Sequence, residues 1–400
     1  DAKHVVLPLV RKKISMEEQA AKKSIIEVRD NGVKRRIGVI SLPTFYQDFA
    51  ARQRGDKDFK SATRDVARLL GELKKDKVDN VLIDLRNNGG GSLIEAVDLT
   101  GLFIDKGPVV MQRNAEGKVD IESDNNAGLA WDGPMGVLIN RGSASASEIF
   151  AAAIQDYGRG VIIGEGSFGK GTVQTLFNLD RFGGSEKARY GELKMTIAQF
   201  FRINGGTTQL RGVTPDIKLP AMSDTENFGE SSYDNALPWV AIKPAPYMPT
   251  GDLKDIVPLL DKKHEARVAK DKDFQYLLDD IALVVKQRKE NQISLNEAVR
   301  RKERDAQEAR AKAREKRLIA QISNPSDDLV VIPDPKDVLK GAKAASKTAK
   351  QIAAVKGALR TDDGLQGDER ALSAELDAET AAKSAKDVLL NESARILADE

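Results

Sequence analysis

Apolar runs alternate with segments of helical periodicity between residues 37 and 220. Apolar side chains recur at helical spacing in residues 59–75 and 147–157. Between these segments lie short runs rich in β-branched residues, as strands buried on both faces tend to be, at residues 81–85, 137–139 and 161–163. The alternation predicts an α/β core over residues 31–220.

A hairpin and two flanking segments complete this part of the chain. Residues 194–203, continued by Asn204-Gly-Gly-Thr, predict a β-hairpin near the end of the core. Residues 4–10 suggest a strand without nearby partners, so residues 1–30 are expected to be the remnant of a preceding module and its connector. Residues 221–250 carry Ser, Asn and Pro and predict a linker with one anchoring segment, Ala236-Leu-Pro-Trp-Val.

Residues 251–400 are predicted to form a mainly α-helical C-terminal domain. Helical periodicity ends in a charge-dense segment at residues 299–317. A solvated helix face is the favoured interpretation of that segment, and a docking surface is the alternative. Beyond Ile332-Pro-Asp-Pro the chain is rich in Ala, Lys and Asp, which predicts a peripheral and partly disordered end.

The composition excludes several kinds of catalytic site. The 400 residues include no cysteine, which rules out thiol nucleophiles, disulfides and thiolate metal sites. The two histidines are His4, near the start of the chain, and His264, in a segment expected to be a solvated helix. Neither position suits the buried, oriented imidazole of a Ser-His-Asp triad, and zinc bound by several histidines is equally disfavoured. No cofactor and no metal are predicted.

Charge and hydropathy add few constraints. The formal net charge of +2 creates no global field for nucleic acid. No stretch reaches the roughly 18 apolar residues that would span a bilayer. The sequence begins without Met and without a signal-peptide pattern, so a targeting segment has been removed or the chain is a piece of a longer one.

Three serines, at positions 143, 145 and 147, lie where a predicted strand runs into a predicted helix. A serine on such a turn is exposed, and the free N–H groups at the start of the helix can hold the oxyanion of a tetrahedral intermediate. The alternative is that Ser145 or Ser147 only caps the helix. The local sequence leaves both interpretations open.

Lys170 provides a candidate base that needs no histidine. In water its pKa would be near 10.4, so only about one lysine in a few thousand is neutral at pH 7. Burial between Gly169 and Gly171 would lower that pKa, and the neutral amine could accept the serine proton. If Thr172 and the following residues form a strand, Gln174 lies on the same face as Lys170 and could orient the amine. The alternative for Gln174 is an ordinary strand residue.

Two glycine-rich segments allow other interpretations. Residues 164–170 fit the first seven positions of a phosphate-binding loop, but Gly171 replaces the required hydroxyl residue and a strand is predicted to follow, so ATP binding is disfavoured. Gly89-Gly90-Gly91 follows a buried strand and could supply N–H donors to an oxyanion. Without further context, tight-turn glycines are the commoner explanation.

Three segments together resemble the carboxyl-terminal processing peptidases. They are Asp84-Leu-Arg-Asn-Asn-Gly-Gly-Gly, Gly142-Ser-Ala-Ser-Ala-Ser-Glu-Ile and Gly169-Lys-Gly-Thr-Val-Gln. The segments from Gly205 and from Arg211-Gly-Val-Thr-Pro-Asp also match, and with the long C-terminal extension they point to the tail-specific protease branch. The resemblance covers roughly residues 10 to 300.

This resemblance implies a role for each matching residue. Ser145 would be the nucleophile, Lys170 the general base and Gln174 its orienting partner. The N–H groups of Ala146 and Gly91 would form the oxyanion hole, with Gly90 as the alternative to Gly91. The implied fold is a protease core of mixed sheet with flanking helices, of the crotonase-like kind.

The family's members cleave proteins near an apolar C-terminus, usually in the bacterial periplasm, with a PDZ module that captures the tail. Here the N-terminal region and most of the PDZ module are missing, and residues 1–30 would be the remnant of that module. Protein substrates with apolar tails are the expected partners, together with an adaptor protein or a second copy bound through the helical regions. The alternative function is a catalytically silent peptide-binding module on the same fold.

Overall fold

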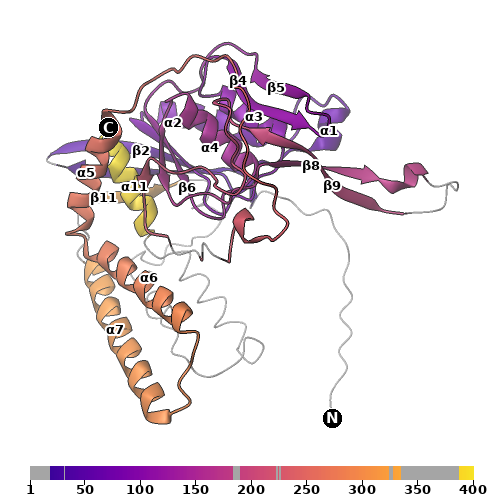
Figure 1. The fold of residues 1–400 in the computed structure, drawn as a ribbon. Helices are drawn as coiled ribbons and strands as arrows, with labels where there is room; N and C mark the ends of the chain where they lie inside the picture. Colours follow the sequence, from indigo (N-terminus) through magenta and orange to yellow (C-terminus); the bar gives the residue numbers. More distant parts are fainter. Residues whose placement is uncertain are drawn as a thin grey trace, which may run out of the picture.

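The computed structural model describes residues 19–30, 32–182, 190–221, 224, 227–323, 328–334 and 387–400 (Figure 1). Helices cover both faces of a central sheet, and a smaller antiparallel sheet lies beside it. The predicted α/β fold with a mixed sheet, flanking helices and a helical C-terminal region is confirmed.

The central sheet has seven strands in the order β10-β7-β6-β3-β2-β1-β11. Neighbouring strands from β2 to β10 run parallel, whereas β1 pairs antiparallel with β2 and with β11. Strands β3 and β6 are buried along their whole length, which their nearly uninterrupted apolar sequences allow. The strand bounds are β1 Lys22–Asp30, β2 Val33–Ser41, β3 Asn80–Asp84, β6 Met135–Ile139, β7 Val161–Gly164, β10 Ile217–Lys218 and β11 Leu329–Pro333.

Three helices pack on one face of this sheet, α2 (Ala62–Lys75), α3 (Leu93–Gly101) and α4 (Ala146–Asp156). Ser61 and Ser92 cap the first two of them by accepting hydrogen bonds from backbone N–H groups. The same apolar core includes residues of the smaller sheet, whose order is β5-β4-β9-β8. The remaining bounds here are α1 Phe49–Gln53, β4 Gly107–Asn114, β5 Val119–Asp124, β8 Thr172–Asn178, the 3₁₀ turn η2 Leu179–Phe182 and β9 Glu192–Phe201.

The opposite face of the central sheet is covered by α5 (Ile256–Val268) and α11 (Val388–Ala398). Ile396 and Leu397 of α11 are completely buried, and Asn80 Nδ2 donates a hydrogen bond to Leu397 O over 2.9 Å. The prediction of a peripheral end is therefore wrong for α11, because its apolar side chains fill this face of the sheet. Residues 335–386, the rest of the predicted end, lie outside the described residues.

Helices α6 (Lys272–Glu290) and α7 (Glu297–Ser323) form a pair that projects from the body of the protein (Figure 1). Ion pairs join them, with Arg314 2.6 Å from Asp280 and Arg317 3.1 Å from Asp273. Residues 297–307 of α7 are all exposed, which agrees with a solvated helix face. Within the described residues, no helix is both long and apolar enough to cross a bilayer.

Two further expectations need correction. Residues 4–10 lie outside the described residues, but β1, which falls in the expected remnant 1–30, is an integral strand of the central sheet. The predicted hairpin exists, but β9 pairs with the upstream strand β8. The turn at Asn204-Gly-Gly leads only to an isolated bridge between Gly206 and Ala241.

Candidate active site

The three serines of the turn between β6 and α4 have different surroundings. Ser143 Oγ donates to Leu85 O and Ser147 Oγ donates to Asn88 O, each over 2.8 Å, and both serines are completely buried. Ser145 lies between them and is half-buried. Among these three hydroxyls, Ser145 is thus the one that a ligand can reach.

Ser145 also has an unusual backbone conformation. It occupies the N-cap position of α4 with φ 60° and ψ −112°, whereas ordinary N-caps are extended. A positive φ at a residue with a Cβ is strained by about 1–3 kcal/mol and persists only where surrounding structure imposes it. The Ser145 conformation is therefore held by its neighbours.

Glu148 is the buried group that holds this turn. Its carboxylate accepts four hydrogen bonds, from Ser145 N (2.8 Å), Ser167 Oγ (2.6 Å), Gly169 N (2.7 Å) and Lys170 N (3.0 Å). Burial raises the pKa of Glu148 to about 7, although all four donors favour the ionised form. One carboxylate thus joins the serine turn to the lysine loop.

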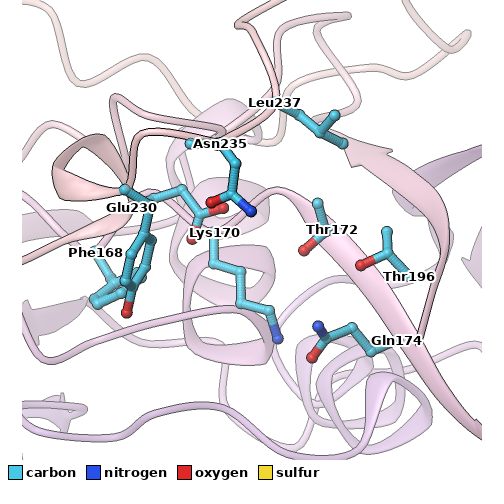
Figure 2. Close-up of a pocket in the computed structure, with 10 residues that line it drawn as sticks. Phe168, Lys170, Thr172, Gln174, Thr196, Glu230, Asn235 and Leu237 are labelled. Atoms are coloured by element: carbon cyan, nitrogen blue, oxygen red, sulfur yellow. The ribbon is translucent and has the colours of Figure 1, made fainter. Parts of the chain in front are cut away.

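Lys170 lies in that loop, between β7 and β8, and its side chain points into a cavity of about 580 Å³ (Figure 2). Burial lowers the pKa of Lys170, and the positive charge of Lys194 lowers it further. The carboxylates of Glu230 and Glu148 act in the opposite direction. Among the described residues, no carboxylate forms an ion pair with the Lys170 amine. The neutral form is therefore more populated than for a lysine in water.

Thr172 and Gln174 line the same cavity as Lys170, which itself precedes β8 (Figure 2). Gln174 is exposed and pairs across the hairpin with Thr196, at a register shift between Val173 and Gln174. No hydrogen bond of the Gln174 carboxamide is found among the described residues.

The glycine turn after β3 lies against the serine turn. A Cβ added to Gly90, which has φ +102°, would lie 2.8 Å from Ala144 O and 2.9 Å from Ser145 Cβ, so only glycine fits there. Gly90 N donates to Asn88 Oδ1 over 2.9 Å and is already engaged. In contrast, the N–H groups of Gly91 and Ala146 have no acceptor within the described part of the chain.

Residues 227–240, within the predicted linker, lie over the cavity that contains Lys170. Glu230 N donates to Phe168 O over 3.0 Å, and Arg141 Nε donates to Phe228 O over 2.8 Å. The short 3₁₀ turn η3 (Glu230–Ser232) is part of this segment. Residues 227–240 contribute half of the residues that line the cavity, namely Glu230, Tyr233, Asn235, Ala236 and Leu237.

His264 lies away from this site. His264 is buried, with Nδ1 2.8 Å from Glu392 Oε1, so the expectation of a solvated position is wrong for this side chain. It lies on α5 and faces α11, on the side of the sheet opposite α4. His4 lies outside the described residues. The described part of the chain contains no cluster of three His, Asp or Glu side chains that could bind a metal ion.

Sequence reasoning missed two contributors to the site. Glu148 stands three residues after Ser145, and that Ser-x-x-Glu spacing at the start of a helix was the available signal. Within residues 227–240, the predicted anchoring segment Ala236-Leu-Pro-Trp-Val contributes Ala236 and Leu237 to the cavity wall, whereas the contributions of Glu230, Tyr233 and Asn235 had no signal, because polar sequence is typical of any connecting segment.

Comparisons with known proteins show which family the chain resembles. Residues 36–219 match the family described as peptidase family S41, and residues 223–400 match the C-terminal domain of tail specific protease. The chain is 42% identical over 308 residues to the tail-specific protease of Haemophilus influenzae, covering 76% of this chain and 42% of that protein. It is 32% identical over 217 residues to the chloroplastic carboxyl-terminal-processing peptidase 2 of Arabidopsis thaliana, covering 54% of this chain and 38% of that protein.

Among solved structures, the photosystem II D1 C-terminal processing protease is 30% identical, with a TM-score of 0.41 and coverage of 53% of this chain and 51% of that one. The chain spans less than half the length of the two curated relatives. The two family matches adjoin one another and together extend over most of the sequence. The chain belongs to peptidase family S41, in its tail-specific serine protease branch.

Proposed function

We propose that this chain is a serine endopeptidase in which Ser145 is the nucleophile and Lys170 the general base. The observation that carries the proposal is the Glu148 carboxylate, which accepts hydrogen bonds from the backbone of both residues. It ties the strained turn that carries the accessible Ser145 to the loop that carries Lys170, whose pKa is lowered, although Ser145 itself is not among the residues that line the cavity. A base activates a weak hydroxyl when the two side chains come within hydrogen-bond reach, and the shared carboxylate supports this by holding both backbones together.

The reaction begins when the neutral Lys170 amine accepts the proton of Ser145 Oγ, which attacks the carbonyl carbon of the scissile peptide bond. The negative charge that develops on the carbonyl oxygen is stabilised by the N–H groups of Ala146 and Gly91. Protonated Lys170 then donates its proton to the leaving amine, and the acyl-enzyme forms. Water enters, gives a proton to Lys170 and attacks the ester carbon; the bond to Ser145 Oγ then breaks, Lys170 returns the proton to that oxygen, and the new C-terminus is released.

The free N–H of Gly91 supports its assignment to the oxyanion hole over Gly90, whose N–H already donates to Asn88. Gln174 lines the cavity with Lys170, and its carboxamide would orient the amine without adding a charge. The segment after the lysine forms strand β8 instead of opening a helix, so it lacks the geometry of a phosphate-binding loop.

The expected substrate is a protein with an apolar C-terminal tail. Phe168, Tyr233 and Leu237 give one wall of the cavity an apolar character, which suits an apolar side chain near the scissile bond. The relatives' names specify tail-specific and carboxyl-terminal processing proteases. A periplasmic location, and an adaptor or second copy bound through the helical regions, follow from the same resemblance.

Titration with a fluorophosphonate, which traps activated serines, tests the proposal. Wild type is expected to be labelled stoichiometrically, and Ser145→Ala is expected to lose the label. Ser143→Ala serves as the matched control, because its hydroxyl is buried and bonded to Leu85 O. Labelling of Ser145→Ala at the wild-type rate would reject the assignment.

Substitution of the base separates the enzyme from a catalytically silent peptide-binding module. Lys170→Arg keeps the positive charge but cannot supply a neutral amine, so turnover of a protein with an apolar tail should be lost while the fold is retained. Mass spectrometry of the products and circular dichroism provide the two measurements. A silent module would bind the tail peptide with equal affinity in wild type and variant, and neither would cleave it.

A further inference from the structure

Helix α11 is connected to the candidate active site by an ion pair. Asp387, the N-cap residue of α11, accepts hydrogen bonds from Arg86, with Nη2 to Oδ2 at 2.6 Å and Nη1 to Oδ1 at 3.1 Å. Arg86 also donates to Asp84 through Nε and Nη2, at 2.9 and 2.7 Å. The guanidinium is thus held in a planar, multidentate pair between two carboxylates that are far apart in the sequence.

Arg86 begins the turn that contains the oxyanion glycines. The next residue, Asn87, has φ 59°, and its side chain accepts a hydrogen bond from Asn140 Nδ2 over 3.0 Å. Asn88 follows, and its Oδ1 accepts from Gly90 N over 2.9 Å. Three consecutive residues of the turn, Arg86, Asn87 and Asn88, are thus each fixed by hydrogen bonds of their side chains, and the last of these bonds reaches Gly90.

The same turn contacts the serine turn directly. Asn88 O accepts hydrogen bonds from Ala144 N (3.0 Å) and from Ser147 Oγ (2.8 Å), the residues on either side of Ser145 and Ala146. A displacement at Arg86 would therefore change the separation between the Gly91 and Ala146 N–H groups. Misplacement by about 1 Å can reduce a rate by about 10²-fold.

We propose that Asp387 is a positioning residue for the active site, which acts from the C-terminal domain through Arg86 to hold the glycine turn in its catalytic conformation. This inference rests on the proposed function, because the turn matters only if Gly91 binds the oxyanion. It assigns to α11 a role in catalysis in addition to its burial against the sheet.

Asp387→Ser is the informative variant. Asp387 also caps α11 by accepting from Leu390 N over 2.9 Å, and serine can retain that cap while being too short to reach Arg86. Asp399→Asn is the matched control, since Asp399 pairs with Arg267 (2.7 Å) and Lys263 (3.3 Å) at the other end of α11. Asp387→Glu keeps the charge and should largely restore the wild-type rate.

The full chain is compared by fluorophosphonate labelling rate, by kcat and KM on a protein with an apolar tail, and by thermal unfolding. Asp387→Ser is expected to slow labelling and kcat about tenfold, less than the roughly 10²–10³ for loss of an oxyanion donor, with KM and Tm nearly unchanged. Asp399→Asn is expected to lower Tm and leave the labelling rate as in wild type. In an Arg86→Gln background, Asp387→Ser should have no further effect.

Wild-type labelling of Asp387→Ser would overturn the inference, as would slowing that merely follows a fall in Tm. The inference would also be overturned if Asp387→Ser slowed labelling as much in the Arg86→Gln background as it does in wild type. Failure of the proposed function gives a different result, namely that Ser145→Ala is labelled as fast as wild type.

Discussion

The backbone N–H groups of Ser145 and Lys170 donate to the same atom, Oε2 of Glu148, over 2.8 and 3.0 Å. The two residues come from different loops at the ends of β6 and β7, which are parallel neighbours. Adjacent parallel strands bring their carboxyl ends to one edge of the sheet, and Glu148 fixes the remaining freedom of both loops. The relative position of the Ser145 and Lys170 backbones thus depends on one buried carboxylate.

Replacing this carboxylate should impair catalysis. Glu148→Gln puts an amide with a single acceptor oxygen opposite four donors, so at least one donor loses its partner. We expect a fall in kcat/KM of about 10²-fold and a loss of about 1–3 kcal/mol in the free energy of unfolding. Glu122→Gln on β5 is the control, and it should change neither quantity. Wild-type kinetics in Glu148→Gln would contradict a positioning role.

The raised pKa of Glu148 predicts a pH dependence of stability. The folded-state pKa is about 7, against an ordinary value of 4.5, so the folded state holds this proton more tightly than the unfolded state. The resulting contribution to stability is present below about pH 4.5 and is lost as pH rises through 7. Chemical denaturation of wild type and Glu148→Gln from pH 4.5 to 8 measures it. As the pH rises, the free energy of unfolding of wild type should fall relative to that of Glu148→Gln. A difference that stays constant over this pH range would contradict a raised pKa of Glu148.

Two charges near Lys170 should move the acid limb of the pH–rate profile in opposite directions. Lys194→Gln removes a repulsion, which raises the pKa of Lys170 and moves the acid limb of kcat/KM to higher pH. Glu230→Gln removes an attraction and moves the limb to lower pH. Lys194 is exposed, so its effect should shrink at high salt. Lys218→Gln, at the edge strand β10, is the control, and shifts of equal sign in both variants would exclude Lys170 as the titrating base.

Adjacent glycines should differ sharply in their tolerance of a side chain. Gly90→Ala would place a methyl group 2.9 Å from Ser145 Cβ at a φ of +102°, so we expect loss of fluorophosphonate labelling. At Gly89 an added Cβ meets nothing within 4 Å, and Gly89→Ala should be labelled at the wild-type rate. Equal labelling of the two variants would show that the glycine turn does not face Ser145.

Local sequence was sufficient for the elements that position the site. β-branched apolar runs predicted β3, β6 and β7, because strands buried on both faces need little else, and helical spacing predicted α2 and α4. The serine and lysine loops followed from the small residues that join these elements. Lys170, Thr172 and Gln174 line one cavity, although Lys170 precedes β8 and the strand is irregular between Val173 and Gln174.

Features that depend on distant partners could not be predicted in this way. His264 looked solvated because its neighbours are charged, yet its partner Glu392 comes from α11. Helix α11 was predicted to be peripheral because its apolar positions lie at the end of an Ala- and Lys-rich region of low hydropathy. Its burial is decided by the open face of a sheet formed hundreds of residues earlier, which no local pattern encodes.

The position of α11 has a consequence for how the molecule folds. The bond between Asn80 and Leu397 joins residues separated by 317 positions in the chain. Contacts of such high sequence separation slow folding, since a large loop must close before the contact can stabilise anything. During synthesis on the ribosome, the sheet face lined by Leu82, Leu138 and Val161 stays only partly covered until residues 388–398 emerge. Throughout that interval the nascent protein exposes a broad apolar surface, which is the condition under which chaperones are needed.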